Sequence, residues 1–221
     1  AAPDYEGSED YQVVPIPYVN IMWSNHMSIN LLGNKVKVNL IPSPIWRGGV
    51  IGEYIAERDD VDNNKVDKMS KVDSTVEAGA LVGFRDGPWE AQLSFAADVG
   101  NEYDGYLIYL NGAYTATVND DFKLKLGART TYASDDYMDT YFGVSSSDAA
   151  RSGLKRYSVD DSGIKDVGVS VTAIYALNES WGITGGVSYS RLLSDAKDSP
   201  LVDDEGDKDQ LGASLAITYR F

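Results

Sequence analysis

Residues 210–221 read QLGASLAITYRF, and they carry the clearest signal of the fold class. Its odd positions are apolar from Leu211 onward and end in Tyr219 and Phe221, whereas its even positions are small or polar. Successive side chains of a β-strand point to opposite faces, so a period of two predicts a strand with one apolar face.

The same alternation recurs upstream, and the chain shows no convincing helical periodicity. It is clear in residues 35–40, 75–85, 89–99, 122–129, 167–177 and 181–190. It is weaker in Val13–Trp23, Met27–Leu32, Trp46–Ile55 and Tyr106–Val118. The sequence therefore predicts an all-β protein.

Two all-β architectures compete, a soluble sandwich or barrel and a membrane barrel. The soluble fold turns its apolar faces inward, whereas the membrane barrel turns them toward lipid. The apolar faces here often begin or end in an aromatic residue, as at Trp89, Trp181, Tyr175 and Tyr189. The opposite faces are rich in Gly, Ser and Thr, and segments of about ten residues suit a tilted membrane strand. These features favour an antiparallel transmembrane β-barrel of the bacterial outer membrane.

Composition limits the functions open to this chain. Its 221 residues suit a single domain, here one barrel over residues 1–221, and the absence of Cys excludes disulfides and thiolate chemistry. A net charge of −15 disfavours nucleic-acid binding, because the chain would repel phosphates. No apolar run approaches the ~20 residues of a membrane-spanning helix. We expect no cofactor.

Connections of two lengths alternate along the chain. The short ones are Trp23–His26, Ile41–Ile45, Arg85–Pro88, Val118–Asp121 and Leu177–Ser180, and the long ones are Glu57–Asp73, Ala133–Lys165 and Leu192–Asp209. Outer-membrane barrels have short periplasmic turns and longer extracellular loops. We therefore expect the short connections on the periplasmic side and the long ones on the extracellular side.

Strand parity then gives a strand count. Counting back from the last strand places the connection at about Asp4–Asp10 outside, so one further strand should precede or include Ala1. We therefore expect twelve strands, with the first largely missing from this chain. Ten remain possible if Met27–Leu32 and Val36–Leu40 form one element.

Several stretches resemble the MipA/OmpV family of outer-membrane proteins. They are PDYEGS at 3–8, DYMDTYFGV at 136–144, ARSGL at 150–154, KDVG at 165–168, TGGVSYSRLL at 184–193, DSP at 198–200 and residues 214–221. The resemblance runs from the first residues to the last, and 136–144 and 184–200 are its most specific parts. The glycine-rich strand that begins the family pattern is missing here.

This resemblance implies a non-enzymatic barrel in the outer membrane of a Gram-negative bacterium. The family's namesake is described as a scaffold that joins a lytic transglycosylase to a bifunctional murein synthase. Other members are linked to osmotic response, adhesion and antibiotic entry. The expected partners are therefore outer-membrane lipid and lipopolysaccharide, together with a periplasmic murein hydrolase or synthase.

Charged residues of both signs occupy the expected lumen face. They are Lys35, Lys37, Arg47, Glu53, Glu77, Arg85, Glu90, Asp98, Lys123, Lys125, Arg129 and Arg220. In an open pore these charges would set ion selectivity. The alternative is a ladder of cross-strand ion pairs that fills a narrow, plugged interior.

An acidic loop near the C-terminus is a weak candidate cation site. Asp203, Glu205, Asp207 and Asp209 occur at every second position around a glycine, and carboxylate oxygens are ligands of Ca²⁺. The spacing differs from the EF-hand pattern, and runs of charge are usually solvated, so no metal site is assigned. The alternative to a specific site is diffuse binding of divalent cations by these acids at the lipopolysaccharide layer.

The longest loop, Ala133–Lys165, is either a constriction in the barrel mouth or a surface lid, and Ser145 is placed to cap a short helix.

Catalysis lacks a plausible centre. A Ser-His-Asp site needs an oriented histidine, and His26 falls in an expected periplasmic turn. Asp135 and Asp136 are adjacent acids of a kind common in acidic loops.

Three functions follow from these expectations. The first is a non-enzymatic scaffold or anchor for peptidoglycan-remodelling enzymes. The second is a passive pore for small solutes or ions, and the third is an adhesin that presents the long outer loops. Conductance separates the pore from the other two.

Overall fold

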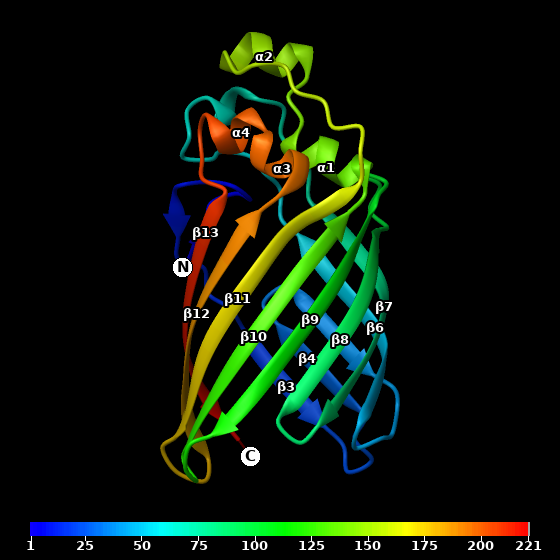
Figure 1. Cartoon of the computed structure of the whole chain (residues 1–221), viewed down its shortest axis with the longest axis vertical. Coiled ribbons are helices and arrows are strands. Elements are labelled where there is room, and N and C mark those ends of the chain that lie inside the picture. The colour runs from blue at the N-terminus through cyan, green and yellow to red at the C-terminus, as the bar shows by residue number, and fades with distance from the viewer. Residues whose placement is uncertain (221) are drawn as a thin grey trace.

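A computed structural model describes residues 1–220, and Phe221, the last aromatic of the deciding stretch, lies outside them. Eleven strands form one antiparallel sheet that follows chain order from β3 to β13 and curls into a barrel wall (Figure 1). These strands are β3 (Tyr18–Met22), β4 (Ser28–Leu32), β5 (Lys35–Asn39), β6 (Trp46–Ile55), β7 (Thr75–Asp86), β8 (Trp89–Asp98), β9 (Tyr106–Thr117), β10 (Phe122–Ala133), β11 (Gly163–Ala176), β12 (Trp181–Leu192) and β13 (Asp209–Tyr219).

The all-β membrane-barrel prediction is confirmed, and each expected segment corresponds to one strand. β4 and β5 are separate strands of a hairpin, because Gly33 turns the chain with φ +61° between them. Eleven of the twelve expected strands are therefore present, and β3 and β13 are the two edges of the sheet. A twelfth strand that closes the barrel stays a prediction.

The N-terminal residues run beside one edge of this sheet. β1 (Ala2–Pro3) and β2 (Tyr11–Gln12) pair with each other near the outer end of β13 (Figure 1). Ala1 and Ala213 exchange two backbone hydrogen bonds, of 2.6 and 3.2 Å, which fix the segment against β13. The connection at about Asp4–Asp10 thus lies at the same end as the long loops.

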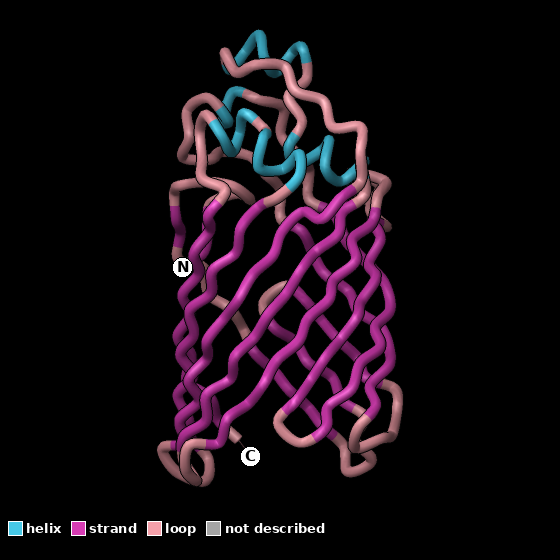
Figure 2. Tube along the Cα trace, in the orientation of Figure 1, coloured by secondary structure: helices cyan, strands magenta, loops and turns pink. Residues whose placement is uncertain are grey.

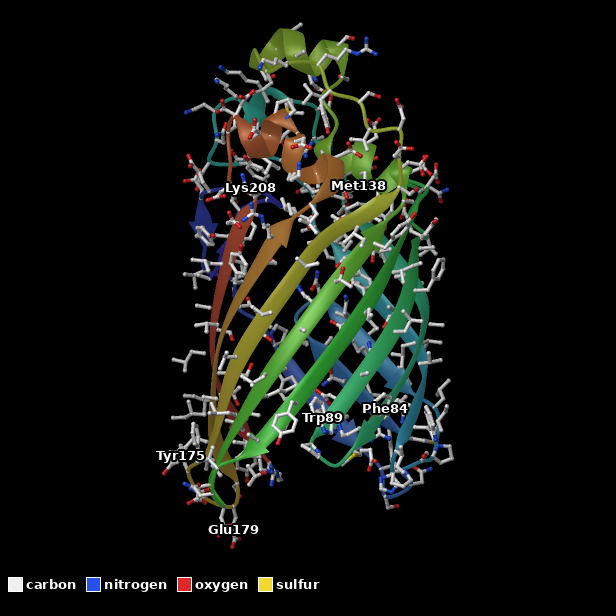
Figure 3. The ribbon with its side chains drawn as sticks, in the orientation of Figure 1. Phe84, Trp89, Met138, Tyr175, Glu179 and Lys208 are labelled. Atoms are coloured by element: carbon white, nitrogen blue, oxygen red, sulfur yellow. The ribbon has the colours of Figure 1, made fainter. Side chains whose placement is uncertain are left out.

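The apolar faces of the strands point outward, as a lipid-facing wall requires. Val187 is 61% exposed and Leu215 is 79% exposed, although both lie within regular strands. Aromatic residues form a belt close to the short turns, where Figure 3 labels Phe84, Trp89 and Tyr175. A soluble sandwich would bury these faces, so their exposure excludes that alternative.

The five short turns expected from the sequence and the three long loops occupy opposite ends of the strands (Figure 2). The long loops fold into a cap that contains η1 (Val66–Lys68), α1 (Asp135–Phe142), α2 (Ser146–Ser152), α3 (Ser194–Asp198) and α4 (Pro200–Asp203). Ser145 caps α2 as expected, because its Oγ accepts a hydrogen bond of 3.1 Å from the Asp148 amide. Within the described residues, no helix is long and apolar enough to cross a membrane.

Candidate functional site

A folded cap lies over the end of the barrel where the long loops gather (Figure 1). Met138 and Phe142 of α1 and Leu201 of α4 are fully buried, and they share one apolar core with Leu107 and Leu192 at the upper ends of β9 and β12. Figure 3 shows Met138 at the base of the cap, directly above the strands. Since strand side chains and cap side chains belong to the same core, loop Ala133–Lys165 is packed onto the strand ends.

Tyrosine rings form the underside of this cap. Tyr137 and Tyr141 stack with centroids 4.4 Å apart, and Tyr103 meets Tyr137 edge-on at 5.1 Å. The Tyr103 hydroxyl donates a hydrogen bond of 2.7 Å to Glu77, and the Tyr109 hydroxyl donates one of 3.3 Å to the same carboxylate. Burial, followed by the nearby Glu77 carboxylate, raises the pKa of Tyr103 well above its usual value. The Tyr103 phenol therefore remains a neutral donor to Glu77.

The charges predicted for the lumen form two groups of contacts in the barrel wall. In the upper group, Lys35 Nζ lies 2.5 Å from Glu53 and 4.4 Å from the centre of the Tyr109 ring. In the lower group, Arg85 Nη2 lies 2.7 Å from Glu90, which also contacts Lys125. The ion-pair alternative describes these residues better than a row of free charges.

The remaining predicted charges have different environments. Arg47 donates 2.6 Å and 3.1 Å hydrogen bonds to the carbonyl oxygens of Ser43 and Trp46, at the short turn between β5 and β6. Lys37 and Lys123 form no side-chain ion pair or hydrogen bond with other described residues. Arg220 follows the end of β13, where its amide donates to Ser180 O at 2.7 Å.

Asp98 has a structural role that strand parity alone misses. It ends β8, and its Oδ2 accepts hydrogen bonds from the amides of Glu102, Tyr103 and Asp104 at 2.6, 2.8 and 3.1 Å. Its Oδ1 accepts from the Gly100 amide at 2.9 Å and from Thr75 Oγ1 at 2.5 Å. Asp98 is thus an anchor for the loop 99–105 rather than a selectivity charge.

A buried charge cluster that the sequence did not predict links the N-terminal segment to β11. Lys165 contacts Glu6 and lies 2.9 Å from Asp166 Oδ2, while Arg129 Nε is 3.9 Å from Asp166 Oδ1. The Tyr137 hydroxyl donates a 3.0 Å hydrogen bond to Glu6. Lys165 and Asp166 begin a motif of the family resemblance, but their partner Glu6 is distant in sequence.

Below the cap, the lumen contains a cavity of about 660 Å³. Charged residues of the upper ion-pair group and of the Lys165 cluster line it, together with a wall of small and hydroxylated residues from β11, β12 and β13. The lining includes Glu6, Lys35, Glu53, Glu77, Arg129, Lys165, Asp166, Ser170, Thr172, Ser188, Ser190, Gln210 and Ser214.

The acidic loop at 203–209 does not assemble a cation site. Glu205 binds Lys65 at 2.5 Å, Asp209 binds Arg191 at 3.2 Å, and Asp207 Oδ1 accepts from the Asp209 amide at 2.8 Å. Asp203 lies in α4 and is exposed. No group of three or more acids and histidines suited to a metal forms within residues 1–220. The weak cation-loop hypothesis therefore has no geometric support.

The residues considered for catalysis are far apart. His26 turns the chain with φ +70° between β3 and β4, at the short-turn end. Asp135 begins α1 at the opposite end, and its Oδ1 accepts a 3.0 Å hydrogen bond from Ser162. The structure thus brings no histidine near these acids.

Comparisons with known proteins give relatives of one kind. The chain is 26% identical to the MltA-interacting protein of Escherichia coli, over 96% of this chain and 83% of that protein. It is 28% identical to the outer membrane protein OmpV of Vibrio cholerae, over 71% of this chain and 59% of that protein. It is 29% identical to the outer membrane protein YiaT of Escherichia coli over 65% of this chain, and the match spans only 57% of YiaT.

A solved structure of the NanC porin covers 92% of this chain with a TM-score of 0.49 and 11% identity. A likeness this distant carries no argument about function. The outward apolar wall and the relatives together identify an outer-membrane β-barrel of a Gram-negative bacterium. The model of the MltA-interacting protein MipA matches residues 1–221, and the chain therefore belongs to the MipA family.

Proposed function

We propose that this protein is a non-enzymatic anchor that holds peptidoglycan-remodelling enzymes, a lytic transglycosylase and a murein synthase, at the inner side of the outer membrane. The observation that carries the proposal is the packed cap, whose apolar core is continuous with the upper ends of the strands and so disfavours free passage of solutes. The name of the MltA-interacting relative supports a murein enzyme as the partner. Membrane lipid and lipopolysaccharide surround the apolar wall in this proposal.

The partner's binding surface lies on two neighbouring periplasmic turns. The Ala176 amide donates a 2.8 Å hydrogen bond to Asp121 O, which joins the turn after β9 to the end of β11. Asp120 and Glu179 are exposed on these turns, and Figure 3 shows Glu179 at the tip. Each turn is also braced internally by an asparagine side chain, so it presents its acids in a fixed position.

Charge reversal tests this surface without disturbing either turn. We expect Asp120→Lys combined with Glu179→Lys to weaken capture of a periplasmic lytic transglycosylase and a murein synthase by the full-length protein. The matched control reverses two exposed acids of the outer loop, Asp160→Lys and Asp161→Lys, and should leave capture unchanged. Equal capture by both double variants, or none by the unmodified protein, would contradict the proposal.

A second candidate, passage of small solutes, is favoured by one specific observation. The lumen retains a cavity of about 660 Å³ below the cap. Opening of the cap would connect this cavity to the outside, so the barrel would conduct only in a rearranged state. Single-channel conductance of the intact protein and of a variant without the loop 134–162 tests this candidate.

A further inference from the structure

The interior below the cap is divided into a filled side and a hollow side. Ile51, Leu81 and Ala96 form a buried apolar cluster with Tyr109 against β6–β9. The cavity of about 660 Å³ extends from there to β10–β13 and the N-terminal residues. A volume of this size falls within the range of small-molecule sites. The hollow side is therefore the part of the interior that can hold a ligand.

The hollow side is a wall of hydroxyl groups set by strand register. Ser170 of β11 pairs with Ser188 of β12, and Thr172 lies one lumen-facing position further along β11. Ser190 and Ser214 complete the set on β12 and β13. None of these five hydroxyls forms a side-chain hydrogen bond with another described residue. They are free to donate to, and accept from, a bound molecule.

Charges that line the cavity already have partners within the protein. Lys35 pairs with Glu53, Lys165 pairs with Glu6 and Asp166, and Glu77 accepts from two tyrosine hydroxyls. A charged ligand would have to compete with these contacts, because burial of an unpaired charge is unfavourable. The lining therefore suits an uncharged ligand.

Two buried acceptors on the same lining lack a hydrogen-bond donor. Asp166 Oδ1 and Gln210 Oε1 form no hydrogen bond, although the two residues are only 4% and 7% exposed. Gln210 is held in place by its amide nitrogen, which donates to Ser8 O at 3.1 Å and to Asp207 O at 2.5 Å. Buried acceptors normally accept at least one hydrogen bond. We therefore expect a molecule in the cavity to donate hydrogen bonds to both oxygens.

We infer that this cavity binds a neutral, polyhydroxylated small molecule, a monosaccharide or disaccharide. Its hydroxyl groups would donate to Asp166 Oδ1 and Gln210 Oε1 and exchange hydrogen bonds with the serine and threonine wall. A sugar matches the wall because each hydroxyl both donates and accepts, as the wall residues do. This inference goes beyond anchoring and does not depend on it.

The first test measures binding of glucose and maltose to the folded, full-length protein in detergent. Saturation-transfer NMR and calorimetry should detect saturable binding of at least one of these sugars. Glucosamine and glucuronate, which carry opposite charges, should bind at least about tenfold more weakly than glucose. Absence of saturable neutral-sugar binding, or preference for a charged analogue, overturns the inference and leaves ordered water as the cavity's only content.

Variants then place the bound sugar in the cavity. Ser188→Leu fills the centre of the wall and should abolish binding. A combined Ser170→Ala, Ser188→Ala and Ser214→Ala variant removes three hydroxyls without added volume and should weaken binding about tenfold or more. Thr184→Ala, on the lumen-facing side of β12 outside the cavity lining, is the matched control and should bind normally. Folding is checked by the heat-dependent gel shift, and unchanged binding by folded Ser188→Leu would refute the site.

Discussion

The ammonium group of Lys165 contacts the carboxylate of Glu6, which lies 159 positions earlier in the chain. The Lys165 side chain is 6% exposed and also lies 2.9 Å from Asp166. This contact attaches the N-terminal segment to β11 at the level where the cap meets the barrel. The cap is therefore held by a buried charge cluster as well as by its apolar core.

Removal of the shared cation should loosen the junction between cap and barrel. Lys165→Met leaves Glu6 and Asp166 close together without their common partner, so we expect a loss of about 3 kcal/mol in the free energy of unfolding. The measurement is the urea midpoint of the heat-dependent gel shift. Lys155→Met, at an exposed loop position, should change stability by less than about 0.5 kcal/mol. Equal midpoints for the two variants would show that the cluster contributes nothing.

Asp98 should be needed for the loop between β8 and β9. Asp98→Asn replaces one of the two carboxylate oxygens that accept hydrogen bonds from backbone amides. The new NH₂ group would then face backbone N–H donors, so we expect the free energy of unfolding to fall by about 2–3 kcal/mol. Asp104→Asn is the control, because its φ of 54° favours asparagine. Urea unfolding of both variants tests the assignment. Unchanged stability of Asp98→Asn would mean that Asp98 does not anchor the loop and is better described as a lumen charge.

The barrel wall could be predicted from the sequence because each strand has one lipid-facing side. That requirement imposes a strict period of two on about ten residues, which a single sequence displays. β3 is the exception, since Pro15 and Pro17 lack the amides that a paired strand needs, and the expected segment Val13–Trp23 shortens to Tyr18–Met22.

The cap could not be predicted in the same way. α1 has eight residues and α2 has seven, which is too few to show a helical stripe of apolar residues. Only the start of α2 was expected, from Ser145 as its N-cap. The partner of Lys165 is set by how the N-terminal segment packs, and no local pattern encodes a contact across 159 positions. Asp98 was predicted to face the lumen from its place in the strand pattern, but the loop that follows it determines its hydrogen bonds.

The outward position of Val187 can be tested by a charged substitution. Val187 is 61% exposed near the middle of β12, so Val187→Arg would place a guanidinium in the lipid and should cost about 2–4 kcal/mol in the free energy of unfolding. Thr184→Arg, on the opposite face of the same strand, should cost clearly less because its side chain lies in the lumen. Unfolding in phospholipid vesicles measures both, and a reversed order would contradict the assigned faces.

Acid should release α2 from the rest of the cap. Burial alone would raise the pKa of the Asp148 carboxyl, but hydrogen bonds from Ser145 Oγ and the Ser70 amide lower it from 3.8 to about 2. Because the folded-state pKa is depressed, the ionised carboxyl stabilises the cap above about pH 4, and this contribution is lost as the pH falls toward 2.

Pepsin cleavage measured between pH 2 and pH 4 tests this pH dependence. We expect cleavage near residues 145–153 to increase as the pH falls through this range, and Asp148→Asn to be cleaved readily at every pH. Cleavage that rises equally in the protein and in Asp148→Asn would mean that another group controls the cap.

Conductance decides whether the packed cap closes the barrel. Ala133 of β10 pairs with Gly163 of β11, so replacing residues 134–162 with Asn-Gly would join the two strands by a two-residue hairpin turn. We expect no discrete conductance steps from the full-length protein in planar bilayers, because the apolar core fills the mouth. The shortened variant should give discrete steps, since the cavity would then open outward. Conductance steps from the intact protein would favour the pore over the anchor. If the shortened variant shows a normal heat-dependent gel shift but no conductance, the barrel is blocked below the cap, at the cluster of Ile51 and Leu81.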